Sequence, residues 1–416
     1  MRSPRQKKSI STPSNSKLTT SSKKNEDYFE TTLSLRQIFH HGSTSYPKLV
    51  RRLDIDETRL NALSLSSGIQ FTHTVRGVMG TTMKLHDVNK VKEYQKQDKY
   101  NKFSLKLDYK SEPIVVPDMN DKETVIALAK MTYNAYIPIG SDDWYDLEEK
   151  YGWNEPFGWE EDGIRGHVFA DPKNETVIIA IKGTSMMGGG PTVPKDKKND
   201  NRLFSCCCAR VGPSWSPVCD CYMGNSQCDQ RCLEISVDED GFYFDAATRL
   251  WEFIQDNYPN AAVWLTGHSL GGGLSGLLGW TYGVPVVGYE APGEQLAARR
   301  LHLPGPPALP YQEMPIWHVG HTADPIFMGA CNGVPSSCWL GGYAMESKCH
   351  TGKVCLYDAI KELGWKLDIR THRVKDVIEK VLSVWEKVPT CEPEKDCVDC
   401  GWWEFLLFLD ISDANG

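Results

Sequence analysis

The feature that most constrains this chain is an apolar run followed at once by a glycine-rich turn, within residues 261–275. Residues 263–265 (Val-Trp-Leu) are long enough for a short buried strand, and residues 267–271 (Gly-His-Ser-Leu-Gly) follow directly. A serine at the tip of so sharp a turn adopts strained backbone angles, and glycines beside it let the strand and the next helix close beneath it. The sequence therefore predicts a nucleophile elbow with Ser269 at its tip; the alternative is a glycine-rich turn with an incidental serine.

Helical and strand patterns alternate on both sides of this turn. Three stretches have the apolar spacing of a helix packed on one face, and three are short apolar runs typical of buried strands. The helices are expected at Glu123–Tyr136, Asp245–Tyr258 and Arg373–Trp385, and the strands at Thr176–Lys182, Val284–Tyr289 and Ile316–Val319. Strands that alternate with helices predict an α/β fold with a mainly parallel central sheet, and the elbow predicts the α/β-hydrolase form of it.

A serine that transfers acyl groups needs a histidine as base and a carboxylate that holds this histidine in one tautomer. In α/β-hydrolases the three follow in the order Ser, Asp, His. Asp324 lies at the end of an apolar strand, although an Asp before Pro325 is also typical of a turn. His350 and His372 follow it; His350 lies among cysteines, whereas His372 directly precedes a strong helical pattern. We predict Ser269 as nucleophile, Asp324 as acid and His372 as base, with His350 as the alternative base.

An acyl-transfer site also needs backbone donors for the developing oxyanion. The N–H of Leu270, the residue after the nucleophile, is the first expected donor. Thr184 follows the strand expected at Thr176–Lys182, and its N–H is the expected second donor. The Thr184 hydroxyl is a candidate third.

The fourteen cysteines all lie in the second half of the chain. An even number in clusters predicts disulfides formed in an oxidising compartment. The glycosylation sequon at Asn174 agrees with that compartment. Zinc is the alternative, because Cys219-x-Cys221 and Cys397-x-x-Cys400 have spacings seen in metal sites, but no second matched pair completes four ligands. We therefore predict no metal and no organic cofactor.

Charge and hydropathy exclude two kinds of partner. The net charge of −8 argues against a nucleic-acid partner, which would favour a basic face, and no stretch reaches the length of a membrane span.

Composition divides the chain into three parts. Residues 1–34 are predicted to be a disordered basic, serine-rich tail, 35–390 the hydrolase domain, and 391–416 a cysteine- and aromatic-rich tail. Residues 186–240 are rich in glycine, proline, lysine and cysteine, so we expect a disulfide-stapled insertion without a core element.

Five segments together resemble the fungal autophagy-related lipases, which belong to the class 3 fungal lipase superfamily. The triple cysteine beside the elbow makes this resemblance far more specific than the serine motif alone. The resemblance runs from about Leu35 to Phe405. Its segments are Ile38–Gly42 (IFHHG), Ile181–Ser185 (IKGTS), Phe204–Arg210 (FSCCCAR), Gly267–Gly272 (GHSLGG) and Thr322–Pro325 (TADP).

The resemblance implies a vacuolar lipase that hydrolyses membrane phospholipids, notably phosphatidylserine, and triacylglycerols, and that lyses autophagic bodies and other vesicles in the vacuole. Ser269, Asp324 and His372 match the family's nucleophile, acid and base, and residues 186–240 match its lid region. The family needs no cofactor and no obligate protein partner. Its members reach the vacuole through the endoplasmic reticulum and multivesicular-body vesicles by an N-terminal signal anchor, and residues 1–34 contain no such apolar segment.

Three other functions compete with a lipase. One is a soluble carboxylesterase that acts on small or aryl esters. Another is a catalytically silent protein that keeps a lipase-like fold for lipid binding. The last is a hydrolase with an attached zinc module.

Overall fold

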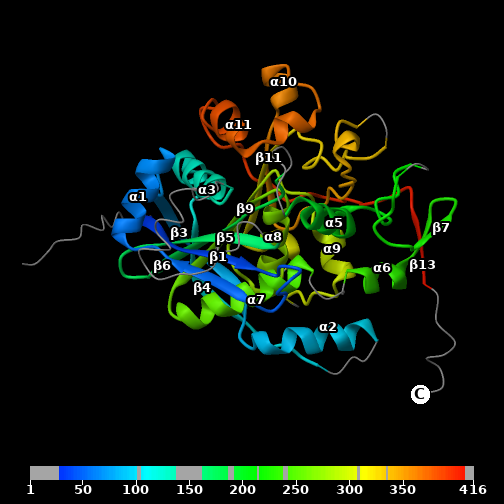
Figure 1. Ribbon diagram of the computed structural model, residues 1–416, viewed down its shortest axis with the longest axis horizontal. Helices are drawn as coiled ribbons and strands as arrows, with labels where there is room; N and C mark the ends of the chain where they lie inside the picture. Colours follow the sequence, from blue (N-terminus) through cyan, green and yellow to red (C-terminus); the bar gives the residue numbers. More distant parts are fainter. Residues whose placement is uncertain are drawn as a thin grey trace, which may run out of the picture.

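The computed structural model describes residues 28–100, 105–136, 162–185, 192–212, 215–237, 242–306, 310–333 and 336–407 (Figure 1). Its strands are β1 (Phe29–His41), β2 (Val50–Asp54), β3 (Thr72–Leu85), β4 (Tyr109–Pro117), β5 (Ile164–Ala170), β6 (Thr176–Ile181), β7 (Tyr222–Gly224), β8 (Gln227–Asp229), β9 (Ala262–His268), β10 (Val286–Tyr289), β11 (Ile316–His321), β12 (Lys353–Tyr357) and β13 (Glu404–Leu406). Its α-helices are α1 (Glu57–Ser67), α2 (Val91–Lys99), α3 (Lys122–Asn134), α5 (Val193–Phe204), α6 (Gln230–Ser236), α7 (Tyr243–Asn257), α8 (Leu270–Tyr282), α9 (Gln295–Arg300), α10 (Ala359–Leu363) and α11 (Val374–Asp376). Single turns of 3₁₀-helix lie at Val88–Lys90, Tyr311–Glu313, Trp339–Gly341 and Ile369–His372, and a π-helical stretch at Val377–Leu382 continues α11.

Ten of these strands form one mixed sheet, in the order β12-β11-β10-β9-β6-β5-β1-β3-β4, with β2 paired to β1. Strands β6, β9, β10, β11 and β12 run parallel to one another. Their carboxyl ends therefore share one edge, where loops in such sheets carry functional residues. The parallel half and its helices confirm the predicted α/β-hydrolase fold.

The parallel strands are buried on both faces, which is why their sequences read as continuous apolar runs. In β6, Val177, Ile179 and Ile181 pack with helices α7 and α8 on one face, whereas Ile178 and Ala180 pack with α3 on the other. The predicted helices over Glu123–Tyr136 and Asp245–Tyr258 form as α3 and α7. In Arg373–Trp385 the five apolar residues expected to face inward are buried, and they are Val374, Val377, Ile378, Val381 and Leu382.

The other half of the sheet is antiparallel and comes from the N-terminal part of the chain. Strand β1 lies between β5 and β3, and it begins at Phe29, six residues before the start that we predicted for the ordered domain. Residues 28–34 are polar on average, yet Leu33 is fully buried and alternates with outward-facing polar residues. This two-residue period supports a strand that average hydrophobicity does not reveal. Residues 1–27 lie outside the described part of the chain.

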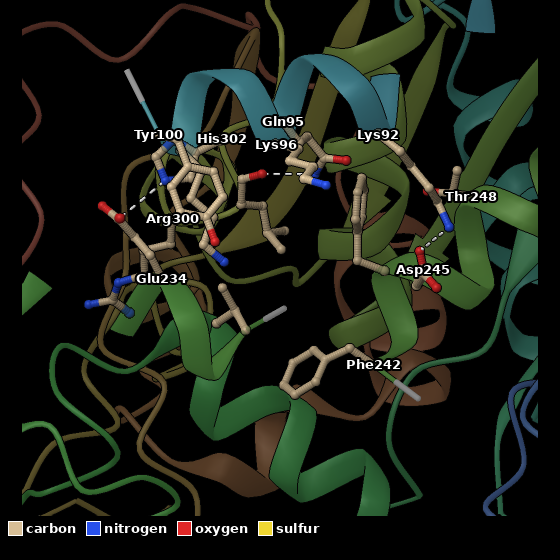
Figure 2. Close-up of a pocket in the computed structure, with 14 residues that line it drawn as sticks. Lys92, Gln95, Lys96, Tyr100, Glu234, Phe242, Asp245, Thr248, Arg300 and His302 are labelled. Carbon is tan, nitrogen blue, oxygen red and sulfur yellow. Dashed lines mark hydrogen bonds and ion pairs between the residues drawn. The ribbon is translucent and has the colours of Figure 1, made fainter. Parts of the chain in front are cut away.

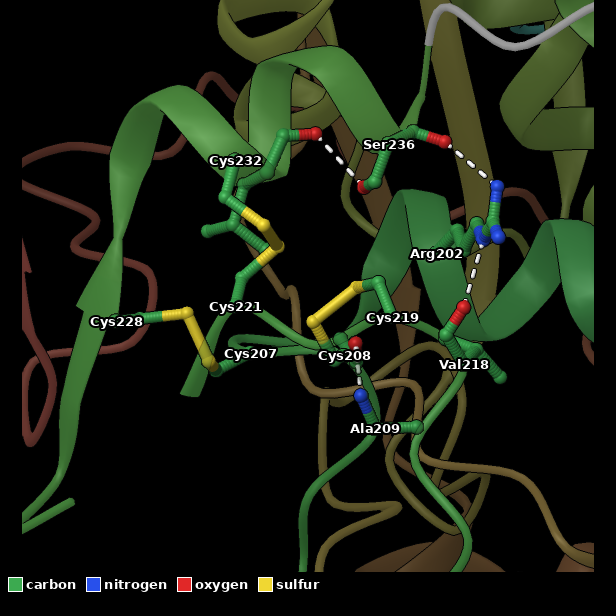
Figure 3. Close-up of a disulfide and its surroundings, with 12 residues drawn as sticks. Arg202, Cys207, Cys208, Ala209, Val218, Cys219, Cys221, Cys228, Cys232 and Ser236 are labelled. Carbon is green, nitrogen blue, oxygen red and sulfur yellow. Dashed lines mark hydrogen bonds between the residues drawn. A yellow bond between two sulfur atoms is a disulfide. The ribbon is translucent and has the colours of Figure 1, made fainter. Parts of the chain in front are cut away.

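All fourteen cysteines lie in the described residues and form seven disulfides, which confirms the disulfide prediction. Three of these bonds staple the segment after α5: Cys207–Cys228, Cys208–Cys219 and Cys221–Cys232 (Figure 3). The sulfur atoms of Cys208, Cys219 and Cys221 lie within 4.8 Å of one another, but each is bonded to another sulfur and offers no thiolate to a metal.

The expectation that residues 186–240 hold no core element was wrong. Helix α5 is buried along its C-terminal half, and Leu203 and Phe204 belong to the main core. Composition hid this helix because its buried polar residues have specific partners: Asp196 pairs with Lys182 at 3.7 Å, and Asn201 donates to the Gly342 carbonyl at 2.9 Å. Residues 186–191, where the implied lid would begin, lie outside the described residues.

The C-terminal segment is joined to the domain rather than separate from it. Disulfides link Cys391 to Cys355, Cys397 to Cys349 and Cys400 to Cys206, and β13 pairs with β8. Figure 1 shows β7 and β13 at the opposite end of the long axis from α1. Among the described residues, no helix is both long and apolar enough to cross a bilayer.

Candidate active site

The elbow predicted around Ser269 forms between β9 and α8. Ser269 has φ 57° and ψ −129°, a left-handed conformation that costs energy for a residue with a side chain. Its N–H donates to the Tyr289 carbonyl at 3.0 Å, which ties the turn to β10. Glycine is required on both sides: a Cβ at Gly267 would lie 2.4 Å from the Gly271 carbonyl, and one at Gly271 would lie 2.2 Å from the Ile181 oxygen.

Asp324 and His372 meet although 48 residues separate them. The His372 Nδ1–H donates to Asp324 Oδ2 at 2.6 Å, and both side chains are buried. This bond fixes the imidazole tautomer and leaves Nε2 as the basic nitrogen. Burial raises the pKa of Asp324, but the charge and the hydrogen bond of His372 outweigh it and hold that pKa at about 2. The carboxylate is therefore ionised at ordinary pH.

The alternative base, His350, lies elsewhere. Its Nδ1 faces Glu394 at 3.3 Å, and its Nε2 lies 3.0 Å from the Ala291 carbonyl. Although burial works against it, the hydrogen bond that His350 donates to Glu394 raises the pKa of His350. The ring thus connects the C-terminal segment to the core, and it is His372 that contacts Asp324.

The elbow and the His372 loop are joined by a residue that the sequence analysis did not assign. His268 Nε2–H donates to the His372 carbonyl at 2.7 Å, and its Nδ1 accepts from the Tyr136 hydroxyl at the same distance. Burial lowers the pKa of His268 to about 3, so the ring is neutral and can bond both partners in this way. The two histidine rings lie 4.4 Å apart, which brings the loop carrying His372 against the residue before Ser269. The sequence did contain a signal for this role, because His268 is the histidine directly before Ser269 in the Gly-His-Ser-Leu-Gly motif.

The two expected oxyanion donors flank the elbow. Leu270 is the first residue of α8, and its N–H has no acceptor within the helix. A Cβ at Gly183 would lie 3.1 Å from the Ser269 Cβ, so the Gly183–Thr184 turn is next to the serine. The Thr184 hydroxyl, however, donates to Asp200 Oδ2 at 2.6 Å. The prediction of this hydroxyl as a third oxyanion donor was therefore wrong, because its hydrogen is already donated to the buried carboxyl group of Asp200.

The sequence analysis also missed Asp200, because the polar composition of residues 186–240 gave no sign of a buried carboxyl group. It is fully buried on α5, and burial raises its pKa well above that of an ordinary aspartate. Because Asp200 holds Thr184 through its side chain, helix α5 positions the backbone of the expected oxyanion turn.

A cleft of about 940 Å³ opens over this arrangement. Its lining is mainly apolar, and Thr184, His268 and His372 form part of its wall. Leu340, which is 88% exposed, lies at the cleft. Three cationic side chains also line it: Arg370, Arg373 and Lys375. An apolar cleft with a few polar groups at one end is typical of a site for an amphiphilic substrate.

A second cavity of about 370 Å³ lies between α2, α7 and the end of α9 (Figure 2). The polar groups around it bond to one another: Lys92 pairs with Asp245 at 2.8 Å, and Gln95 donates to the Leu301 carbonyl at 2.8 Å. His302 lies between Asp98 and Glu234. These contacts dock α2 on the domain.

Asn174, the predicted glycosylation site, lies in the exposed turn between β5 and β6. Its N–H donates to the Asp171 carbonyl, and its side chain faces solvent. The turn is accessible, and the modification itself stays a prediction.

A strained serine between a parallel strand and a helix, beside a buried Asp–His pair and an apolar cleft, is typical of an α/β-hydrolase. Among proteins with known descriptions, the chain is 43% identical over 399 residues to a Pichia angusta protein named "Putative lipase ATG15", an alignment that covers 89% of this chain and 74% of that protein. The chain belongs to this family of fungal autophagy-related lipases, as the sequence motifs predicted.

Relatives of the same name in other fungi match over shorter stretches. The relative in Cryptococcus neoformans strain B-3501A is 55% identical over 299 residues, which cover 70% of this chain and 56% of that protein. The relative in Candida glabrata is 48% identical over 311 residues, covering 73% and 62%. The chain thus spans little more than half the length of several relatives that it matches. No protein-family model matches it.

Solved lipase structures resemble the chain only in part. Lip2 lipase from Yarrowia lipolytica is 17% identical, with a TM-score of 0.23 over 49% of this chain and 63% of that chain. A structure of the MDLA N225Q mutant from Penicillium cyclopium is 14% identical, with a TM-score of 0.25 over 56% of this chain and 77% of that chain. The fold assignment above rests on the strand order and the elbow instead.

Proposed function

We propose that this protein is a serine lipase that hydrolyses carboxyl esters of membrane phospholipids and triacylglycerols. The observation that carries the proposal is the buried 2.6 Å bond from His372 to Asp324 beside the strained turn at Ser269. Ser269 Oγ and His372 Nε2 are both buried, and neither has a hydrogen-bond partner in the described part of the chain. Buried polar atoms are normally paired, so two unpaired ones in adjoining loops favour a catalytic role.

In the proposed reaction, His372 Nε2 takes the proton of Ser269 as Oγ attacks the ester carbonyl. The N–H groups of Leu270 and Thr184 stabilise the oxyanion, and Asp324 stabilises the imidazolium that forms. The alcohol leaves with the proton from His372. Water, activated by the same nitrogen, then releases the fatty acid and restores the serine.

The cleft supports a lipid substrate over a small ester. Its apolar wall suits acyl chains. Of its cations, Arg370 pairs with Asp368 and Lys375 with Glu379, so Arg373 is the one best suited to a phosphate-bearing headgroup. We further propose phosphatidylserine as a substrate, the vacuole lumen as the place of action, and the lysis of autophagic bodies as the outcome. The printed name of the relatives, "Putative lipase ATG15", supports the lipase activity, and the substrate, place and outcome follow from the family resemblance.

The test is fatty-acid release from phosphatidylserine vesicles and from triacylglycerol emulsions by the purified, oxidised protein and its Ser269→Ala variant. Ser275→Ala is the matched control, since Ser275 lies in α8, the helix that follows Ser269, and its hydroxyl donates only to the carbonyls of Thr266 and Gly271. We expect release by wild type and control, and none by Ser269→Ala.

Other results would point to the competing functions. Equal release by all three proteins would refute the nucleophile. Activity limited to dissolved short-chain esters, without acceleration on aggregated lipid, would indicate a soluble carboxylesterase. Vesicle binding without hydrolysis or reaction with a serine-directed phosphonate would indicate a silent lipid-binding protein.

A further inference from the structure

A second buried carboxyl group lies beside Asp324, and the reaction above does not use it. Glu290 is the first residue after β10, at the same edge of the sheet as the elbow, and it is fully buried. Its φ of 44° is left-handed, an uncommon conformation for a glutamate. Its N–H donates to the Val319 carbonyl at 2.9 Å, which holds the residue between β10 and β11.

The Glu290 side chain contacts two residues at the end of β11. Its Oε2 accepts the N–H of His321 at 3.3 Å, and its carboxyl group is within hydrogen-bonding reach of the Asp324 carboxyl group. Its Oε1 accepts no hydrogen bond from the described residues. The nearest cationic candidate, His321 Nε2, lies 3.6 Å away and instead donates to the Thr371 carbonyl at 3.2 Å.

Two ionised carboxylates in contact repel each other, and neither has a hydrogen to donate. One proton between them converts the contact into a strong charge-assisted hydrogen bond. Asp324 already accepts two donors as a carboxylate, His372 Nδ1–H on Oδ2 and the Ile326 N–H on Oδ1 at 2.8 Å. The proton therefore belongs on Glu290.

We propose that Glu290 is a positioning residue that stays protonated and donates a hydrogen bond to the Asp324 carboxylate, so that the site works at acidic pH. This inference rests on the proposed function. A neutral donor shares the charge of Asp324, which then stabilises a charged His372 less strongly. The charged form of His372, which arises when it takes the Ser269 proton, therefore gains less from Asp324 than it would if Asp324 lacked this donor.

The surroundings of Glu290 agree with a protonated group. Burial, and then the charge of Asp324, raise the pKa of Glu290 well above that of an ordinary glutamate. Burial also lowers the pKa of His321, which disfavours the charged form of this neighbour. In the described part of the chain, three titratable groups face Glu290: Asp324, His321 and Tyr357, the last residue of β12. His372 does not face Glu290 but contacts Asp324.

The test compares Glu290→Gln, which keeps the shape and an N–H donor, with Glu290→Met, which keeps the volume and removes the donor. The readout is the pH profile of kcat/KM on a soluble ester, whose acid limb reports protonation of the base. We expect Glu290→Gln to keep the wild-type acid limb. Glu290→Met should move the limb upward by roughly 0.5–1 pH unit, a fraction of the strength of one charge-assisted hydrogen bond. An unmoved limb in Glu290→Met, or equal movement in both variants, would overturn the proposal.

A second measurement does not need activity, so it remains decisive if the protein proves not to be a lipase. A group whose pKa is raised by folding stabilises the fold below its unfolded pKa, here about 4.5, and this contribution is lost as the pH rises. Glutamine does not titrate. The Tm of Glu290→Gln minus that of wild type should therefore increase as the pH rises above about 4.5. A difference that falls over the same range would show an ionised Glu290 paired with His321, and would overturn the proposal.

Discussion

The Asp324→Asn substitution removes one charge from the site and leaves its shape unchanged. The amide oxygen of the new side chain should keep the bond from the Ile326 N–H, which is 2.8 Å long in the wild type, so the NH₂ group then faces His372. The imidazole must accept at Nδ1 and carry its proton on Nε2, which is the wrong tautomer for a base. In a serine protease the same change lowers kcat about 10⁴-fold.

The expected loss here is of the same order. The bond that Asp324→Asn disrupts is charge-assisted, 2.6 Å long and fully buried. A decrease in kcat of about 10³- to 10⁴-fold corresponds to about 4–5.5 kcal/mol of lost transition-state stabilisation. KM should change little, because the carboxylate does not line the cleft.

The assay is steady-state hydrolysis of a soluble ester, with circular dichroism to show that the variant is folded. Asp358→Asn is the matched control: Asp358 accepts a hydrogen bond from Thr322, two residues before Asp324, and asparagine caps a helix as well as aspartate does. Turnover of Asp324→Asn within tenfold of wild type would refute the role of the carboxylate.

Three further predictions concern the scaffold of the site. Gly271→Ala, whose Cβ would lie 2.2 Å from a backbone oxygen of β6, should lower the Tm by several degrees and reduce kcat, whereas Gly212→Ala meets nothing within 4 Å and should match wild type in thermal melts. Thr184→Val removes a buried bond and should destabilise the protein by about 1–3 kcal/mol in denaturant titrations and lower kcat, while Thr184→Ser should recover both. Cys206→Ser with Cys400→Ser removes a disulfide and should cost about 2–5 kcal/mol and speed proteolysis near the C-terminus.

Each of these predictions has a contradicting result. Equal melting of both alanine variants would mean that the elbow tolerates a side chain. A Thr184→Val enzyme with wild-type kcat would separate this turn from catalysis. Unchanged proteolysis of the double serine variant would mean that strand pairing alone holds the C-terminal segment.

The parts of the site that follow local rules could be predicted from the sequence. The elbow needs glycine where backbones touch, and chain order places Asp324 and His372 after Ser269. The parallel strands were found because they are buried on both faces, so their composition is uniform. These features depend on short segments, so the residues within each segment are enough to predict them from a single sequence.

The parts that were missed depend on contacts between distant segments. Asp200 and Glu290 are buried carboxyl groups, and their sequences resemble ordinary loops and helices because their partners lie far away in the chain. Average composition misled in the same way at β1, where alternating burial places polar residues on the outer side of a strand. Pairing of the cysteines likewise required the fold, since their number can be counted in the sequence but their partners cannot be deduced from it.

The most direct test of the account is to identify the residue that reacts with a fluorophosphonate probe, by mass spectrometry of the digested protein. The account predicts one adduct per chain, on Ser269, formed much more slowly in Asp324→Asn. An adduct on another serine, or no adduct on the folded, oxidised protein, would contradict the claim that Ser269 is an activated nucleophile.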